Sequence, residues 1–342
     1  MKPIDSNESE SGNKTEKISD LKDWYQGEKI TCNRLSDERL VIGENIGAVN
    51  EIPRIAKQPN KNSHRSDWIS DIAQLDDTKI MATSMRGSLH YGFETVRQDT
   101  YAIGSESDQS GDKWLIVAIA DGVSASPRAH AIADYMVRQT VLVVADALQT
   151  GKMIFKKEYW ENISKKLVEI SVEYCKTATR GRIQLNQNID VDTIDIDTFA
   201  REWAATLEYI VIQTKKTLGS QTRKFVHISV AGDGSAYILN ENKGWYIVKS
   251  GKQRNSEILS NAVSPLPLTP KAYSIKFGEL SLDDCLVMVT DGLGDFIGSG
   301  NTPIGGFFQK AFPKCESLIQ FLHYSSVALR QADDDRTIIL IK

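Results

Sequence analysis

The chain of 342 residues lacks the features that mark several large classes of protein. It has no run of about 18 uninterrupted apolar residues, so the sequence predicts no membrane-spanning helix. Lysine and arginine number 41 against 45 aspartates and glutamates, which leaves no basic field for binding nucleic acid. The opening segment, MKPIDSNESESGNKTEK, is too polar to contain the apolar region of a signal peptide. We therefore predict a cytoplasmic protein that binds neither membranes nor nucleic acid.

Cysteine is scarce as well. The four cysteines are far apart and show none of the paired spacings of a zinc site: Cys32, Cys175, Cys285 and Cys315. The sequence also contains no Walker loop and no other glycine-rich loop of the kind that holds phosphates. No cysteine or serine stands in a nucleophile motif. These absences argue against a nucleotide-binding loop and against a covalent enzyme intermediate.

The N-terminal part of the chain is polar and carries no motif. Residues 1 to about 20 are rich in Ser, Glu, Lys and Asn and are predicted to be disordered. Residues 21–80 contain only isolated apolar positions between polar breaks. We interpret residues 1–80 as an N-terminal extension and residues 81–342 as the main domain.

From about residue 81 the apolar residues follow regular patterns. Apolar runs bounded by turn residues predict strands at 114–120, 225–231, 236–240, 244–250, 285–290 and 336–342. Apolar residues three and four positions apart predict two helices, at about 127–150 and 156–180. Strands joined by short turns, with the helices grouped apart from them, indicate an α+β domain built on antiparallel sheet.

Four aspartates lie at the ends or flanks of these strands, in different parts of the chain: Asp99, Asp121, Asp291 and Asp334. Carboxylates that converge repel one another unless cations lie among them. Oxygen ligands suit hard ions such as Mg²⁺ or Mn²⁺ better than zinc. Gly122 follows Asp121 directly, and a glycine there lets the backbone approach an ion and offer a carbonyl ligand. The pattern predicts a divalent metal site built from strand ends.

The acidic segment at 188–199, NIDVDTIDIDTF, has a different interpretation. A calcium-binding loop needs glycine at its sixth position and glutamate at its twelfth. Counting from Asp190, these positions hold Asp195 and Arg201. The segment is therefore predicted to be a solvated acidic loop.

Five segments in order carry a resemblance: RQD at 97–99, VAIADG at 117–122, VAGDGSAYIL at 230–239, VMVTDGLGDFI at 287–297 and DDRTIILI at 334–341. Together they resemble the metal-dependent Ser/Thr protein phosphatases of type 2C, in a divergent bacterial branch. The resemblance covers roughly residues 83–342. It implies an α+β fold of two stacked antiparallel β-sheets flanked by helices, an α-β-β-α sandwich.

Seven positions match metal ligands of that family. The resemblance implies that two Mg²⁺ or Mn²⁺ ions are held by Asp99, Asp121, the Gly122 carbonyl, Asp291 and Asp334. It also implies a third, weaker ion near Asp233 and Asp295. In the family an asparagine follows the last ligand, whereas this chain has Asp335.

The chain departs from the family at the positions that handle phosphate. The family often has an arginine five residues before the first metal aspartate, where this chain has Glu94. Candidate substitutes are Arg97, Arg86 and His90. Many members place a histidine after the Asp-Gly pair as a proton donor, but here the residue is Val123. We expect Glu94 to face solvent and His90 to lie at the mouth of the metal site as phosphate ligand or proton donor.

The implied activity is hydrolysis of phosphoserine and phosphothreonine in proteins by a water that bridges two divalent ions. The implied partner is a phosphorylated protein, such as a cognate Ser/Thr kinase or the target of that kinase. Two alternatives stay open. One is a catalytically silent relative that acts as a docking or sensing module, which Glu94 and Val123 favour. The other is a phosphatase for a small phosphorylated metabolite.

Overall fold

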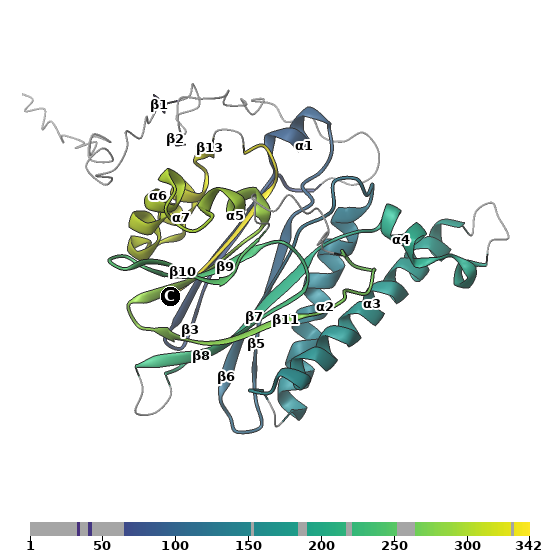
Figure 1. The fold of residues 1–342 in the computed structure, drawn as a ribbon, viewed down its shortest axis with the longest axis horizontal. Coiled ribbons are helices and arrows are strands. Elements are labelled where there is room, and N and C mark those ends of the chain that lie inside the picture. Colours follow the sequence, from purple (N-terminus) through teal and green to yellow (C-terminus); the bar gives the residue numbers. More distant parts are fainter. Residues whose placement is uncertain are drawn as a thin grey trace, which may run out of the picture.

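Two antiparallel β-sheets lie face to face, and helices cover the outer side of each (Figure 1). The structure is a computed structural model that describes residues 33–34, 40–42, 65–151, 154–183, 190–216, 221–251, 264–329 and 332–342. The predicted disorder of the first 20 or so residues lies outside these ranges. The α-β-β-α sandwich predicted for the domain is confirmed. In the described parts of the chain, no helix is both long and apolar enough to cross a membrane.

The first sheet has five strands in the order β11-β8-β7-β6-β5. Their bounds are Thr100–Ser107 for β5, Lys113–Ala120 for β6, Leu207–Gln213 for β7, Thr222–Ala231 for β8 and Ser274–Ser281 for β11. The long helices α2 (Ala129–Thr150) and α3 (Lys157–Ile183) cover its outer face. Every residue of β7 is buried, because the sheet is covered on both sides.

The second sheet has six strands in the order β10-β9-β12-β14-β4-β3. Their bounds are Trp68–Leu75 for β3, Thr78–Met85 for β4, Ser235–Asn240 for β9, Gly244–Lys249 for β10, Asp284–Val289 for β12 and Arg336–Ile341 for β14. Its outer face is covered by α5 (Asp291–Ile297), α6 (Pro303–Ala311) and α7 (Leu318–Ser325).

Shorter elements complete the described structure. Helix α1 spans Ser88–Gly92, α4 spans Ile196–Glu202, and two 3-10 turns, η2 and η4, span Val191–Thr193 and Phe312–Lys314. A small third sheet joins β1 (Asn33–Arg34), β2 (Leu40–Ile42) and β13 (Ala328–Leu329). In it, β2 runs parallel to β13. The N-terminal extension thus contributes strands to a sheet completed by residues near position 328.

Side chains alternate between two apolar layers along each strand of the six-stranded sheet. On β12, Leu286 and Met288 face the other sheet, whereas Val287 and Val289 face helices α5 to α7. This alternation follows from the pleat of a β-strand. Burial of each such side chain contributes about 1.5–3 kcal/mol. Since both faces are covered, the strand reads as an uninterrupted apolar run in the sequence.

The strands and helices predicted from apolar patterns are confirmed as β6, β8, β9, β10, β12, β14, α2 and α3. The predicted domain boundary at residue 81 falls within an element of the sheet, because residue 81 lies inside β4. Strand β3 pairs with β4 along its whole length, and β4 pairs with β14. The sheet therefore already includes residues from position 68 onward, which were assigned to the extension.

The segment predicted as a solvated acidic loop is partly helical. Asp190 accepts a hydrogen bond from the amide of Asp192 and caps η2, and Asp195 accepts one from Thr198 at 2.7 Å and caps α4. Aspartate is a preferred residue at such caps because its side chain satisfies a free amide. The repeated Asp-x-Asp-x-Thr pattern here marks two helix starts.

Candidate metal centre

The acidic residues predicted as metal ligands come from strand ends at one end of the sandwich. Asp121 follows β6, Asp291 follows β12, and Asp233 lies in the turn between β8 and β9. Carboxylate oxygens of these three residues all lie within 4.8 Å of one another. A second group with the same spacing consists of His90, Asp334 and Asp335.

Asp99 lies between the two groups and is buried. Its Oδ2 accepts a hydrogen bond from Thr290 Oγ1 at 2.6 Å, and its backbone carbonyl accepts one from Ser84 Oγ at 3.2 Å. Its Oδ1 has no donor among the described residues although it is shielded from solvent. A buried, unsatisfied carboxylate oxygen is costly unless a cation or ordered water pairs with it. The position of Asp99 therefore fits a metal ligand.

The carboxyl groups raise one another's pKa. Burial and the charge of Asp335 raise the pKa of Asp99 to about 8. Desolvation and the charges of Asp99 and Asp291 raise the pKa of Asp121 well above its usual value. The pKa of Asp334 is also raised, by burial and by the charge of Asp291. A divalent cation relieves this repulsion, and hard oxygen donors suit Mg²⁺ and Mn²⁺.

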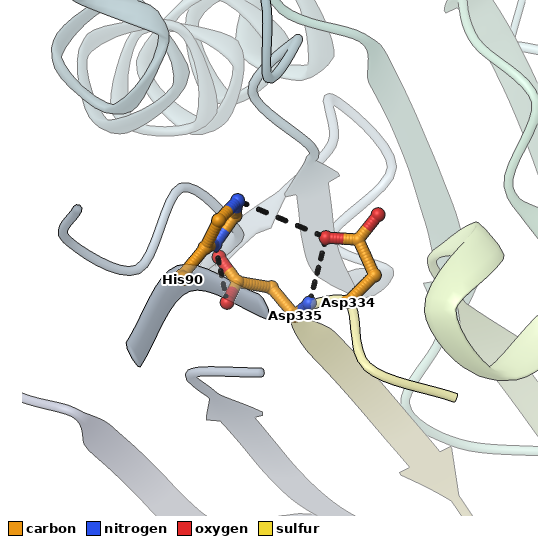
Figure 2. Close-up of side chains that lie close together, drawn as sticks. All are labelled: His90, Asp334 and Asp335. Atoms are coloured by element: carbon orange, nitrogen blue, oxygen red, sulfur yellow. Dashed lines mark hydrogen bonds and ion pairs between the residues drawn. The ribbon is translucent and has the colours of Figure 1, made fainter. Parts of the chain in front are cut away.

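His90 is held in the second group by Asp335. Helix α1 carries His90, whose Nδ1 lies 2.8 Å from Asp335 Oδ1 and whose Nε2 lies 3.9 Å from Asp334 Oδ1 (Figure 2). Burial alone would lower the pKa of His90, but the hydrogen bond to Asp335 and the charges of Asp334 and Asp99 outweigh it, and the pKa is raised. His90 thus lies inside the acidic cluster, with 3% of its surface exposed.

Asp335 is a residue whose importance the sequence reasoning missed. Its carboxylate accepts hydrogen bonds from the backbone amides of Gly87 at 2.7 Å, Gln98 at 2.5 Å and Asp99 at 3.3 Å. It therefore ties β14 to the two segments that carry His90 and Asp99. The available signal was the replacement of the family's asparagine, since an ionised carboxylate can accept all these bonds and an asparagine side chain cannot.

Glycines around the centre allow backbone segments to touch. A Cβ on Gly292 would lie 1.9 Å from the carbonyl oxygen of Asp335. A Cβ on Gly122 would lie 2.7 Å from the Cβ of Ala129 in α2. Glycine at 122 was expected because it lets an ion approach the backbone, and the structure adds a packing reason. Both positions require glycine for close approach of neighbouring elements.

The predicted phosphate-binding arginines are occupied elsewhere. Arg97 donates to the carbonyls of Ser66 and Asp99, and Arg86 forms an ion pair with Asp67 at 3.0 Å. Both guanidinium groups are buried, with 2% of Arg97 and 4% of Arg86 exposed. Through these contacts they hold the backbone around the centre. Glu94, which was expected to face solvent, is half-buried and has a left-handed backbone conformation with φ of 55°.

Arg65 is a further cation beside the centre that the sequence did not reveal. Its guanidinium donates to the carbonyl of Arg97 at 2.6 Å and to that of Asp99 at 3.4 Å, and it forms an ion pair with Asp134 of α2 at 2.5 Å. Because it lies in a polar segment without a pattern, no sequence signal distinguished it. It links the segment before β3 to the backbone of a candidate ligand.

The remaining predicted ligand, Asp295, lies on α5 one turn after Asp291. In the described part of the chain it belongs to neither group of close ligand atoms. The structure therefore brings together Asp99, Asp121, Asp233, Asp291, Asp334 and His90, and leaves Asp295 beside them.

A comparison with protein families identifies the family of this chain. The family model of protein phosphatase 2C matches residues 86–332, whereas no curated protein matches the chain. Among solved structures, the chain is similar to RsbX in complex with magnesium, at 14% identity over 80% of this chain and 98% of that one, with a TM-score of 0.48. It is also similar to the S. agalactiae serine/threonine phosphatase, at 14% identity over 77% of this chain and 98% of that one, with a TM-score of 0.48. A third similar structure is the catalytic domain of PstP in complex with two manganese ions. It is 13% identical over 78% of this chain and 97% of that one, with a TM-score of 0.45.

The family match spans well over half of the chain and includes Asp99, Asp121, Asp233 and Asp291, whereas Asp334 lies two residues beyond its end. The fold of two stacked sheets between helical layers and the acidic cluster at one end of it are those expected from the ordered sequence segments. The chain belongs to the protein phosphatase 2C family.

Proposed function

We propose that this protein hydrolyses phosphoserine and phosphothreonine in proteins with the help of two Mg²⁺ or Mn²⁺ ions. The observation that carries the proposal is the convergence of four strand-end carboxyl groups, Asp99, Asp121, Asp291 and Asp334, where burial and the charges of neighbouring carboxylates raise the pKa of Asp99, Asp121 and Asp334. Asp233 and Asp295 are proposed as ligands of a third, weaker ion, and the Gly122 carbonyl as a backbone ligand. The proposed partner is a phosphorylated protein, such as a cognate kinase or its target.

When bound, the two ions supply a water of lowered pKa and positive charge for the phosphoryl oxygens. The residues of the chain hold and orient the site. Thr290 fixes the rotamer of Asp99 by donating to its Oδ2, and its own hydroxyl accepts from the amide of Thr337 at 2.9 Å. Asp335 holds β14 against the segments of Gly87 and Gln98, so that Asp334 faces the other carboxylates. Preorganised ligands of this kind need little rearrangement during the reaction.

Metal removal tests the proposal. Protein treated with EDTA should lose hydrolysis of p-nitrophenyl phosphate and of a phosphothreonine peptide, and added Mn²⁺ or Mg²⁺ should restore both. Zinc should restore activity poorly because the ligands are mainly hard oxygen donors. Full turnover in excess chelator contradicts the two-metal mechanism.

Two other outcomes separate the alternatives. Binding of Mn²⁺ without any turnover on either substrate would identify a silent docking or sensing module. Turnover on a panel of phosphorylated metabolites that greatly exceeds turnover on phosphopeptides would identify a small-molecule phosphatase.

A further inference from the structure

The Nε2 atom of His90 is a buried polar atom without a hydrogen-bond partner among the described residues. The imidazole points this atom toward the carboxylate of Asp334, at a distance of 3.9 Å from Oδ1 (Figure 2). That separation is too long for a hydrogen bond. A buried polar atom aimed at a carboxylate beyond hydrogen-bond reach indicates that a third species belongs between them.

The distance suits two ligands of one metal ion. Bonds of about 2.1 Å from an ion to an imidazole nitrogen and to a carboxylate oxygen can span up to about 4.2 Å. The backbone amide of Asp335 donates to Asp334 Oδ1 at 2.9 Å, which fixes that oxygen in place and leaves it a second lone pair. His90 is also fixed, because its Nδ1 lies 2.8 Å from Asp335 Oδ1.

Asp335 Oδ1, 2.8 Å from His90 Nδ1, places a carboxylate beside one ring nitrogen, as in metal-binding histidines. A carboxylate that accepts a hydrogen bond from one ring nitrogen fixes the tautomer and directs the lone pair of the other nitrogen at the metal. The Asp335 carboxylate itself also accepts from the amides of Gly87, Gln98 and Asp99. It is therefore suited to orient His90 rather than to bind an ion.

We propose that His90 is a metal ligand, and that its Nε2 and Asp334 Oδ1 hold one divalent ion at the edge of the carboxylate cluster. This inference rests on the proposed metal centre and gives one of its ions an imidazole ligand, with Asp335 as a positioning residue. A nitrogen donor favours Mn²⁺, Fe²⁺ or Co²⁺ over Mg²⁺ at this position. It also replaces the role of proton donor that the sequence suggested for His90.

Electron spin-echo spectroscopy of Mn²⁺-loaded protein tests the ligand directly. The wild-type protein should show ¹⁴N modulation from a coordinated imidazole, and H90Q should lose it. The matched control H323Q removes an exposed histidine of α7, in the helical layer over the outer face of the six-stranded sheet, and should keep the modulation. Circular dichroism of each variant establishes that it is folded.

Calorimetric titration supplies a second readout that needs no turnover. H90Q should bind Mn²⁺ at least tenfold more weakly at one site, while its affinity for Mg²⁺ changes less than twofold. D335N keeps the imidazole but loses part of its support, and should weaken Mn²⁺ binding roughly 10–100-fold, the range usual for residues that orient a metal ligand.

The outcomes distinguish this inference from the proposed function. Bound Mn²⁺ without ¹⁴N modulation, or unchanged Mn²⁺ affinity in H90Q, overturns the assignment of His90. If H90Q then also has lower turnover, His90 acts on the substrate and the phosphatase proposal stands. Failure of the wild-type protein to bind Mn²⁺ at all overturns both.

Discussion

Lys249 and Glu208 form an ion pair of 2.6 Å that joins the two sheets beneath the loop of Asp233. The Lys249 ammonium also donates to the carbonyls of Gly232 at 3.1 Å and Gly234 at 2.6 Å. The other oxygen of the Glu208 carboxylate lies 3.1 Å from His227 Nε2. All three donors of the ammonium are thus used, and they hold the backbone on both sides of Asp233.

Replacement of Lys249 by methionine should destabilise the protein strongly. Glu208 is 2% exposed, so the variant leaves a buried carboxylate without its nearest cation. Breaking such a pair typically costs about 3–5 kcal/mol. Urea unfolding should show this loss for K249M, and a smaller loss for the double variant E208Q/K249M than the sum of the single ones. The exposed Lys243 provides the control, since K243M should change stability by less than about 0.5 kcal/mol. Equal stability of K249M and K243M would contradict the role of the pair.

The same pair predicts a loss of stability in acid. Burial alone would raise the pKa of Glu208, but Lys249 and His227 lower it from 4.5 to about 2. Because the pKa is depressed in the folded state, the contribution to stability is present above about pH 4.5 and is lost as the pH falls toward 2. The free energy of unfolding of the wild type should therefore exceed that of E208Q near neutral pH, with the difference shrinking between pH 4.5 and 2. A difference that does not depend on pH in this window would refute the prediction.

Removing one of the proposed metal-binding carboxylates should abolish activity without destabilising the metal-free protein. D121N and D291N should each lower turnover by orders of magnitude, because each removes an anionic ligand. In EDTA their melting temperatures should equal or exceed that of the wild type, since either variant removes one partner of the repulsion between Asp121 and Asp291 that raises the pKa of Asp121. D112N, at an exposed hairpin position, serves as control and should leave turnover unchanged. A markedly lower melting temperature of D121N in EDTA would argue against a repulsive cluster.

Truncation separates the sheet from the rest of the N-terminal extension. A variant that begins at residue 65 retains β3, β4 and Arg65 and should unfold cooperatively. One that begins at residue 81 lacks β3 and the first residues of β4, so it exposes unpaired edge groups beside β14. It should be aggregated or lack a cooperative transition in calorimetry. Identical melting temperatures of the two variants would support a domain boundary at residue 81.

The parts of the fold that could be predicted are those whose sequence pattern is set locally. Strand β6 is an apolar run, and Asp121 follows it directly, so both the strand and the candidate ligand could be predicted. Strand β4 was missed because its polar residues are buried and satisfied by distant groups. The hydroxyl of Thr83 accepts from Trp68, and that of Ser84 donates to the Asp99 carbonyl. Such a strand resembles a polar loop when only its own residues are considered.

The clustered carboxylates of the site could be predicted from the sequence, whereas the residues that hold their backbone in place could not. Each aspartate proposed as a metal ligand stands next to a strand and belongs to a recognisable segment. In contrast, Asp335 binds Gly87 and Gln98, and Glu208 binds Lys249, across long stretches of chain. Spacing carries no signal for such pairs. The contacts of Arg97 could not be predicted either. An arginine close in sequence to a candidate ligand can donate hydrogen bonds to backbone carbonyls, as Arg97 does to Ser66 and Asp99, instead of binding phosphate.

The position of β14 has a consequence for how the chain folds during synthesis. This strand lies between β12 and β4, and its register pairs Arg336 with Met85, so a central ladder of the sheet joins residues far apart in the chain. Contacts of such long sequence separation form slowly because a large loop must close first. As a ribosome adds residues, Asp334 emerges after every other candidate ligand, and Asp335, which orients His90, directly follows it. The nascent chain therefore has no complete metal centre until this strand inserts, and the ability to bind metal should arise late, in a single step of folding.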